Sequence, residues 1–300
     1  MTKDRDGQRL DNFLAVRLKG VPRSVVYRVI RTGQVRVNGG RAKPATRLKT
    51  GDVVRIPPAT IRSNKAGDVP PAVMQLLQGS ICYEDDGVMV IDKPAGMAVH
   101  GGSGLSWGVI DAIRKMRPHL GVDLVHRLDR ETSGCMLLAL SGEALKNLGT
   151  QMQNNVIEKR YLCLLDGQME QELIEVREPI SKFERSGQRY MAVDASGKDA
   201  HTTLRRLQDF GGYSFAEAHL HTGRTHQIRV HAHHLGLPLA GDKLYSPAPR
   251  QKFWKTRGLR RMFLHAHQVS FLDGKGNEQM VSCPLPGELK DLLEKLESGL

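Results

Sequence analysis

The feature that most constrains this chain is a polar run, residues 126–134, that passes directly into six apolar residues, 135–140. An apolar run of this length bounded by glycine predicts a buried strand. Asp129 is then expected on the loop that enters the strand, where a sheet can hold a reactive group still. An isolated Asp in this setting could also simply pair with Arg127 or Arg130, or cap a turn.

Elsewhere in the chain, strand-like apolar runs and helical stretches follow one another without regular alternation. This irregular order favours an α+β fold over a doubly wound parallel sheet. A length of 300 residues allows a full core and more than one domain. The expected strands cover 88–91, 135–140, 161–165, 202–207 and 215–220, and the expected helices cover 108–116 and 144–154.

Positive charge is concentrated at the N-terminus. Residues 1–60 carry 14 Lys and Arg against 4 Asp and Glu, whereas the other 240 residues carry 30 against 28. So local an excess marks a module for a polyanion. A membrane surface would also attract it, but no apolar face rich in Trp or Phe accompanies the charge.

Membrane and export signals are not found in the sequence. No run approaches the roughly 20 apolar residues of a membrane span, and the first residues lack the apolar core of a signal peptide. We therefore expect a cytoplasmic protein that does not act at a membrane, and we expect a monomer.

The basic module has its own element pattern. Apolar residues at helical spacing predict helices over about 9–19 and 22–33. Val35 and Val37 alternate with polar residues before the tight turn Asn38-Gly39, and a last strand covers 53–56. This order resembles the S4 RNA-binding domain. We expect the S4 domain over 1–58, a linker of Pro, Gly and polar residues over 59–80 with a short helix at 72–77, and a catalytic domain over 81–300.

One face of the second helix is expected to contact RNA. Arg28 and Arg31 share this face, and such charges neutralise phosphates with little sequence information. A merely solvated basic face is the alternative, but the acidic residues that normally intersperse such a face are nearly absent. The predicted S4 contacts are Arg9, Arg23, Ser24, Tyr27, Arg28, Arg31, Arg36 and Lys43.

Four further blocks follow the 126–134 run in order: Lys-Arg-Tyr at 159–161, and segments 222–231, 241–245 and 264–266. Together these blocks resemble the RluA family of RNA pseudouridine synthases. The resemblance implies a large mixed, mostly antiparallel sheet with the active cleft across its middle. It also implies that a flipped uridine loses its C1′–N1 bond and rejoins through C5. This reaction is redox-neutral and needs no cofactor, which agrees with the lack of a Walker or dinucleotide motif.

The resemblance also implies roles for individual residues. Asp129 is the catalytic carboxylate, which either attacks C1′ or promotes a glycal-type intermediate. Arg229 pairs with it, because an opposite charge within about 4–6 Å favours the ionised carboxylate. Tyr161 stacks on the uracil and is placed to remove the C5 proton. Arg127 fills the gap left by the flipped base with its planar guanidinium. The other expected cleft residues that contact RNA are Arg130, Arg224 and His226.

A metal site among the histidines is considered and set aside. His226, His231, His233 and His234 lie close in sequence, and zinc binds imidazole well. We expect this segment to continue as the strand that carries Arg229, on which His233 and His234 point to opposite faces. No clustered Cys or Glu completes a tetrahedral set, so we expect no metal.

The four cysteines are expected to be reduced and buried. Cys82, Cys135, Cys163 and Cys283 are far apart in apolar runs and have no Cys-x-x-Cys spacing. This pattern predicts neither a disulfide set nor a zinc site.

The S4 module implies a ribosomal RNA substrate. Residues 98–106 are similar to family members that modify large-subunit ribosomal RNA, so we expect 23S ribosomal RNA as partner. Two alternatives stay open: a family member with different target uridines, or an S4 ribosome-assembly factor that has lost catalysis. The joint presence of Asp129, Tyr161 and Arg229 argues against the second.

Overall fold

The computed structural model describes residues 6–18, 23–57, 69–101, 105–185 and 188–299. The chain divides into two compact units, residues 1–65 and 66–300, which are described separately. Residues 59–68 of the predicted linker lie outside the described residues, as do residues 102–104.

The N-terminal unit has two helices and a small antiparallel sheet of order β2-β1-β3. Its elements are α1 (Leu10–Arg17), α2 (Arg23–Arg31), β1 (Arg36–Val37), β2 (Gly40–Arg41) and β3 (Val54–Arg55). The apolar stripes of the helices meet in a core that includes Leu10, Leu14 and Ile30. Asn38 and Gly39 both have positive φ (49° and 77°), as a two-residue hairpin turn requires. The helices and the turn predicted from the sequence are confirmed.

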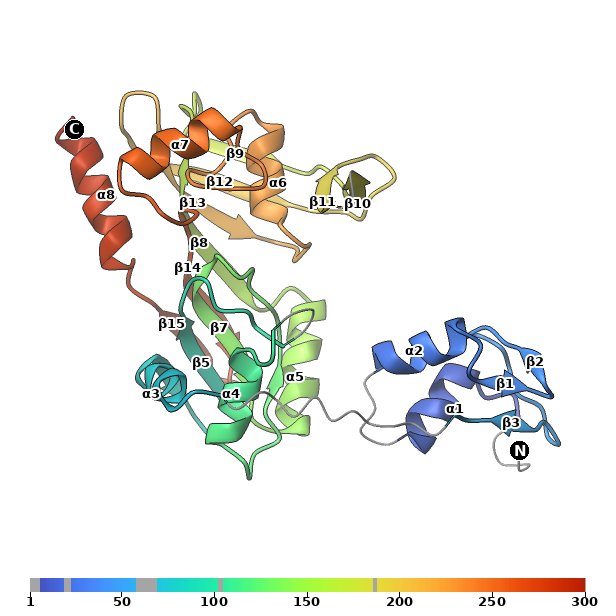
Figure 1. Cartoon of the computed structure of the whole chain (residues 1–300). Helices are drawn as coiled ribbons and strands as arrows, with labels where there is room; N and C mark the ends of the chain where they lie inside the picture. Colours follow the sequence, from blue (N-terminus) through green and yellow to red (C-terminus); the bar gives the residue numbers. More distant parts are fainter. Residues whose placement is uncertain (1–5, 19–22, 58–68, 102–104, 186–187, 300) are drawn as a thin grey trace. The chain divides into compact units, whose positions relative to one another are not determined.

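The C-terminal unit is built on a ten-stranded sheet, with helices at both ends of it (Figure 1). Its helices are α3 (Pro71–Gly79), α4 (Val109–Met116), α5 (Gly142–Gln153), α6 (Gln227–His234), α7 (Ala248–Thr256) and α8 (Gly287–Glu297). The strands of the large sheet are β4 (Ile81–Glu84), β5 (Val88–Lys93), β6 (Asp123–Leu124), β7 (Ser133–Ala139), β8 (Glu158–Leu165), β9 (Leu173–Val176), β12 (Thr202–Asp209), β13 (Ser214–Leu220), β14 (Leu264–Leu272) and β15 (Glu278–Ser282). A separate hairpin consists of β10 (Ile180–Arg185) and β11 (Gln188–Val193).

The strand order is β4-β5-β7-β14-β8-β13-β12-β9, with β15 paired to β14 and β6 to β7. Within the described parts of the sheet, only β7 and β14 pair in parallel. The predicted α+β class with a mostly antiparallel sheet is therefore confirmed. Every strand predicted from a continuous apolar run is also present, because these runs are buried on the sheet.

The apolar residues of the central strands pack against helices on both faces of the sheet. One large cluster joins β5 and β7 to α4 and continues along β8 and β13 to α6, and a second cluster packs the other side of β5 and β7 against α5. α7 and α8 cover a further cluster around Trp254. No helix in the described ranges is both long and apolar enough to cross a bilayer.

The stretch 69–80 differs from the linker that we expected there. The short helix is present as α3, but Leu77 is fully buried and belongs to the same apolar cluster as α4. Burial of this side chain makes the helix part of the C-terminal unit. That unit therefore begins before residue 81.

Three of the four cysteines, which are far apart in the sequence, lie together in the folded sheet. The Sγ atoms of Cys135 and Cys283 are 3.1 Å apart, and those of Cys82 and Cys283 are 3.5 Å apart. All four are free thiols, and Cys82 is exposed rather than buried. Sequence separation conceals this cluster because β4, β7 and the segment after β15 converge only in the folded sheet.

Candidate active site

Two buried cations, Lys93 and Arg261, hold the loop that carries Asp129. Lys93 is fully buried and donates to the carbonyl oxygens of Pro94 (2.8 Å), Met97 (2.9 Å) and Arg130 (3.3 Å). Burial lowers the pKa of Lys93 to about 7. Arg261 donates to the Glu131 carbonyl (3.3 Å). The backbone on the C-terminal side of Asp129 is thus held at successive carbonyls.

The Ser-Gly pair that ends this loop is needed for close packing. Gly134 has φ of 108°, and a Cβ there would collide with the backbone of Ala266 on β14. Ser133 accepts a hydrogen bond from Arg261 (2.8 Å) and lies 2.8 Å from His265 Nδ1. A larger residue at position 134 would separate β7 from β14 and move Asp129.

Arg229 lies on a helix and not on the strand that we predicted. α6 begins directly after His226, whose φ and ψ of 58° and 21° place it in the left-handed region. Ile228 and Val230 mimic strand alternation, yet they pack into two different apolar clusters on either side of the helix. A helix buried on several sides shows no clear period, which explains the error.

An ion-pair chain links the loop that carries Asp129 to α6 and to the turn after α6. Arg229 Nη1 lies 3.1 Å from Asp129 Oδ2. The same guanidinium forms a two-pronged contact with Asp242 at 2.7 and 2.9 Å. Asp242 is fully buried, whereas the Asp129 side chain is 21% exposed. Arg229 therefore has one permanent partner inside the protein and presents its remaining nitrogen to the carboxylate that faces the cleft.

His226 lines this side of the cleft and contacts Tyr245 behind it. The Tyr245 hydroxyl lies 2.9 Å from His226 Nδ1 and accepts the Met191 N–H at 3.1 Å. Burial lowers the pKa of His226, opposed by the nearby Asp129. The other ring nitrogen of His226, Nε2, lies 3.7 Å from Asp129 Oδ2.

Asp129 is thus approached from one side only. Both its contact with Arg229 and its closest approach to His226 fall on Oδ2. Oδ1 accepts no hydrogen bond from the described residues. One carboxylate oxygen is held while the other is available to a bound molecule.

Tyr161 and Lys159 project from β8 into the same cleft. Tyr161 is buried, and burial, followed by the charge of Asp129, raises the pKa of its hydroxyl. Burial also lowers the pKa of Lys159. The ring of Tyr161 therefore offers a neutral, apolar face beside the carboxylate.

The cleft has a volume of about 280 Å³, and its lining includes residues of β8 and β14, which are neighbours near the middle of the strand order. It is lined by the 125–132 loop, β8, the loop from β13 into α6 and Leu264 of β14. Such a volume suits a small ring. Arg127 is exposed at this cleft, and its guanidinium makes no hydrogen bond with other described residues.

Two arginines that we expected to contact RNA use part of their side chains on the protein backbone. Arg130 Nε donates to the Gly96 carbonyl (2.8 Å), and the Gly96 N–H donates back to the Arg130 carbonyl (2.7 Å). Arg224 Nε donates to the Asp199 carbonyl (2.8 Å). Both side chains are still exposed, and only Arg224 lines the cleft. The structure therefore gives Arg130 a role in shaping the loop.

The loop before α6 is organised by Gln227. Its Oε1 accepts from Thr222 Oγ1 (2.7 Å) and from the Arg224 N–H (2.9 Å), and its Nε2 donates to the His201 carbonyl and Thr202. Gln227 is buried and fully used in these contacts. The polar residues of the 222–231 block therefore serve to hold the left-handed turn at His226.

The predicted S4 contacts separate into two groups. Arg28 and Arg31 on α2, with Lys43, are exposed and make no ion pair with described residues, while Arg36 is half-buried. Arg9 and Tyr27 instead both bind Asp11, at 2.7 and 3.0 Å. These contacts lower the pKa of Asp11 to about 2, with the Arg9 hydrogen bond as the main cause. The side chains of Arg23 and Ser24 lie outside the described residues.

The histidines do not form a metal site in the described structure. His231 is buried, 2.9 Å from both Thr202 Oγ1 and the Glu178 carbonyl. His233 and His234 follow it on α6, which corrects their predicted places on a strand. Within the described residues, no group of three His, Cys, Asp or Glu side chains is arranged to hold a metal ion.

Sequence reasoning gave no role to Asp242, Tyr245 or Lys93. Asp242 and Tyr245 belong to the block at 241–245, and Lys93 ends an apolar strand. The signal that could have pointed to Lys93 is its place at the end of the strand, two residues after the apolar run 88–91, because burial of an ammonium requires partners. No local signal showed that Asp242 reaches Arg229.

Known proteins share this arrangement of domains. The family model described as RNA pseudouridylate synthase matches residues 87–234, and the S4 domain model matches residues 8–54. The chain is 42% identical over 303 residues to ribosomal large subunit pseudouridine synthase C of Haemophilus ducreyi, covering 99% of this chain and 95% of that protein. It is 41% identical over 306 residues to the protein of that name in Escherichia coli strain K12, covering 100% and 96%.

Solved structures show the same fold for the larger unit. Human RNA pseudouridylate synthase domain containing 4 superposes with a TM-score of 0.63 at 24% identity, covering 75% of this chain and 96% of that one. Human RNA pseudouridylate synthase domain containing 1 gives 0.60 at 25% identity, covering 77% and 98%.

Proposed function

Because the chain belongs to the RNA pseudouridylate synthase family and carries an S4 domain, we propose that it converts specific uridines of 23S ribosomal RNA to pseudouridine. Curated relatives of about 41% identity that span the whole chain act, by their names, on the large ribosomal subunit. The observation that carries the proposal is the chain Asp129–Arg229–Asp242 in a cleft large enough for a base. In this proposal the protein works as a cytoplasmic monomer without a cofactor.

The reaction is an isomerisation and conserves all atoms. The C1′–N1 bond breaks, the uracil turns, a C5–C1′ bond forms, and the proton lost from C5 is balanced by a proton gained at N1. The target uridine leaves its stack and enters the cleft, since neither C1′ nor C5 is accessible inside a helix. The guanidinium of Arg127 is suited to fill the vacated position.

Asp129 supplies the negative charge at the sugar. Arg229 binds Oδ2, while Oδ1 is available either to attack C1′ or to promote a glycal-type intermediate. Arg229 itself is held by the buried Asp242. The carboxylate is thus positioned before the substrate arrives, which lowers the cost of organising the transition state.

Tyr161 supports the base. Its buried ring beside Asp129 offers a stacking surface for uracil. The raised pKa keeps its hydroxyl protonated at neutral pH. Transfer of the C5 proton to Tyr161 therefore requires the hydroxyl proton to leave in the same step.

Mapping of pseudouridine in 23S ribosomal RNA from cells with and without this protein tests the proposal. We expect discrete positions to lose the modification in its absence and to regain it when the intact chain is restored. Restoration with the Asp129→Asn variant serves as the matched control and is expected to fail. An unchanged map in cells without the protein would favour the ribosome-assembly alternative. Loss of pseudouridine from another RNA class would favour a family member with other targets.

A further inference from the structure

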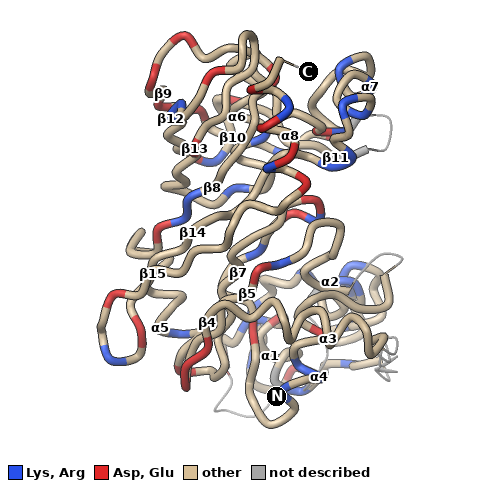
Figure 2. The backbone as a smooth tube through the Cα atoms, turned by 90° about the vertical axis from the view of Figure 1, so that its left-hand side faces the viewer, with Lys and Arg blue, Asp and Glu red and all other residues tan. Residues whose placement is uncertain are grey.

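The segment 243–261 is the most basic part of the C-terminal unit. It holds 7 Lys and Arg and no Asp or Glu, whereas the rest of residues 61–300 holds 23 against 28. α7 forms the middle of this segment, and Figure 2 shows several Lys and Arg positions in blue along it. A surface that only needs to be soluble intersperses the two signs of charge.

Three of the seven cations have partners within the protein. Arg250 forms a two-pronged ion pair with Asp166, and Arg261 binds Glu288 and backbone carbonyls. The Arg257 guanidinium lies 3.7 Å from the centre of the Phe253 ring. These three contribute to the packing of α7 and of the strand that follows.

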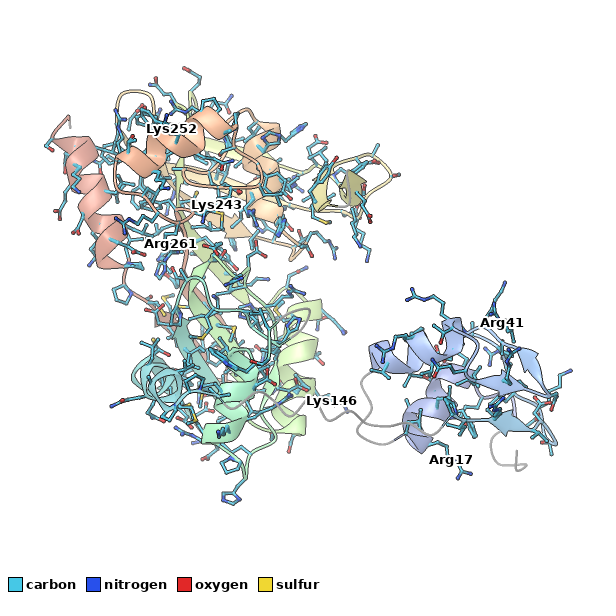
Figure 3. All side chains as sticks on the ribbon, in the orientation of Figure 1. Arg17, Arg41, Lys146, Lys243, Lys252 and Arg261 are labelled. Atoms are coloured by element: carbon cyan, nitrogen blue, oxygen red, sulfur yellow. The ribbon has the colours of Figure 1, made fainter. Side chains whose placement is uncertain are left out.

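The other four cations have no partner among the described residues. Their side chains are exposed, and none forms a hydrogen bond or ion pair with a described residue; they are Lys243, Lys252, Lys255 and Arg260. Lys252 and Lys255 are three residues apart and share one face of α7. Figure 3 marks Lys252 on this helix and Lys243 in the turn that precedes it. Lys255 also complements the helix dipole from the last turn, but Lys252 does not.

α7 is linked to Arg229 through Asp242 and the turn that follows Asp242. Asp242, which holds Arg229, also accepts the backbone N–H of Leu244 at 2.8 Å. Gln251 of α7 then donates to the carbonyls of Ser246 (2.7 Å) and Lys243 (3.2 Å). The basic face therefore has a fixed position relative to the cleft.

We propose that the exposed face of α7, with Lys243 and Arg260 beside it, is a second RNA-binding surface that takes the phosphate backbone flanking the target uridine. The proposal rests on the proposed function, because it assigns the partner to be the RNA substrate. Phosphate contacts fix the position of the RNA along the protein without reading its sequence. Because α7 is linked through Asp242 and Arg229 to Asp129, such contacts would place the target uridine relative to Asp129. The surface lies within the C-terminal unit and is independent of the S4 contacts.

The salt dependence of binding tests the proposal in the full-length protein. Lys252→Gln combined with Lys255→Gln is compared with Lys275→Gln combined with Lys290→Gln, two exposed lysines outside this segment. The probe is a 23S ribosomal RNA transcript, titrated between about 50 and 300 mM KCl. Loss of two phosphate contacts should lower the slope of log affinity against log salt by roughly 1.4–1.8 and weaken binding about 25- to 60-fold at 0.1 M salt.

The control pair should leave the slope at the wild-type value. An equal loss in both pairs would show a general charge effect, and no loss in the α7 pair would show that this face does not bind RNA; either result overturns the proposal. Single-turnover pseudouridine formation at saturating RNA is measured on the same variants. Normal turnover with an unchanged slope refutes the α7 surface alone, whereas absent turnover in the wild-type protein refutes the proposed function.

Discussion

The two units of this protein use their cations in opposite ways. On α2 of the S4 unit, Arg28 and Arg31 are exposed and have no partner among the described residues. In the C-terminal unit, Lys93 and Arg229 are buried and bound to carbonyls or carboxylates. Exposed cations supply affinity that salt screens, whereas buried cations fix the geometry of other groups. On α7 of the C-terminal unit, Lys252 and Lys255 are exposed and unpaired among the described residues, as Arg28 and Arg31 are on α2.

The strongest test of this division removes one charge in the cleft. Asp129→Asn keeps the shape of the side chain but removes the carboxylate that faces the substrate, so we expect no measurable pseudouridine formation. RNA affinity should stay within a few fold of wild type, because affinity resides in exposed cations. Single-turnover assays and filter binding on one preparation measure both quantities. Substantial residual turnover would remove Asp129 from the mechanism.

The second test concerns the buried support of Arg229. Asp242→Asn removes a charge-assisted contact worth about 1.5–3 kcal/mol, which corresponds to roughly a ten- to hundredfold lower single-turnover rate. RNA affinity should change little. Asp166→Asn is the matched control, since Asp166 is also buried and forms a two-pronged pair with an arginine, Arg250. Equal rate losses in the two variants would show that Asp242 acts through general stability.

The sequence predicts those elements of the fold whose pattern lies within one short segment of the chain. The runs that became β5 and β7 are continuous and apolar, and burial on both faces of the sheet explains their success. α6 escaped prediction because it is buried on several sides and begins at a left-handed His226 that Gln227 holds in place. These contacts come from parts of the chain that are distant in sequence, so no pattern within residues 222–234 predicts the helix.

The site shows the same limit. Motif resemblance placed Asp129 and Arg229 together across 100 residues of sequence, and the structure brings them to 3.1 Å. Their roles remain proposals. The buried partner Asp242 and the cluster formed by Cys82, Cys135 and Cys283 depend on which strands and turns converge, so neither was visible in residue spacing.

The units should also differ in their response to acid. All 12 histidines lie after residue 65. Burial lowers the pKa of His126 to about 3 and that of His265 to about 4, against about 6.5 in an unfolded chain. The unfolded chain therefore binds more protons between these values, and stability of the C-terminal unit is full above pH 6.5 and falls as pH decreases toward 4. The loss for two such groups is up to about 2.7 kcal/mol per pH unit.

The S4 unit should be unaffected over the same range. Asp11, with its pKa lowered to about 2, contributes stability above its unfolded value near 3.8 and loses it only below that. Hydrogen exchange on the full-length protein at pH 6.5 and 5.0, corrected for intrinsic rates, measures each unit separately. His265→Gln should reduce the pH dependence of the C-terminal unit, and the exposed His119→Gln should not. Parallel destabilisation of both units would contradict the assignment.

The smallest expected effect is on the S4 side of the comparison. Arg28→Gln combined with Arg31→Gln removes two charges from one face of α2 without removing a contact to described residues. If both bind phosphate, the slope of log affinity against log salt falls by roughly 1.4–1.8. Lys49→Gln combined with Arg55→Gln removes the same charge from exposed positions outside this face and should leave the slope unchanged. Single-turnover chemistry at saturating RNA should be normal in both pairs, since the S4 residues contribute affinity only. A slope that stays at the wild-type value in the α2 pair would show that this face is merely solvated. A lower single-turnover rate at saturating RNA in the α2 pair would show that the two units do not divide binding and chemistry between them.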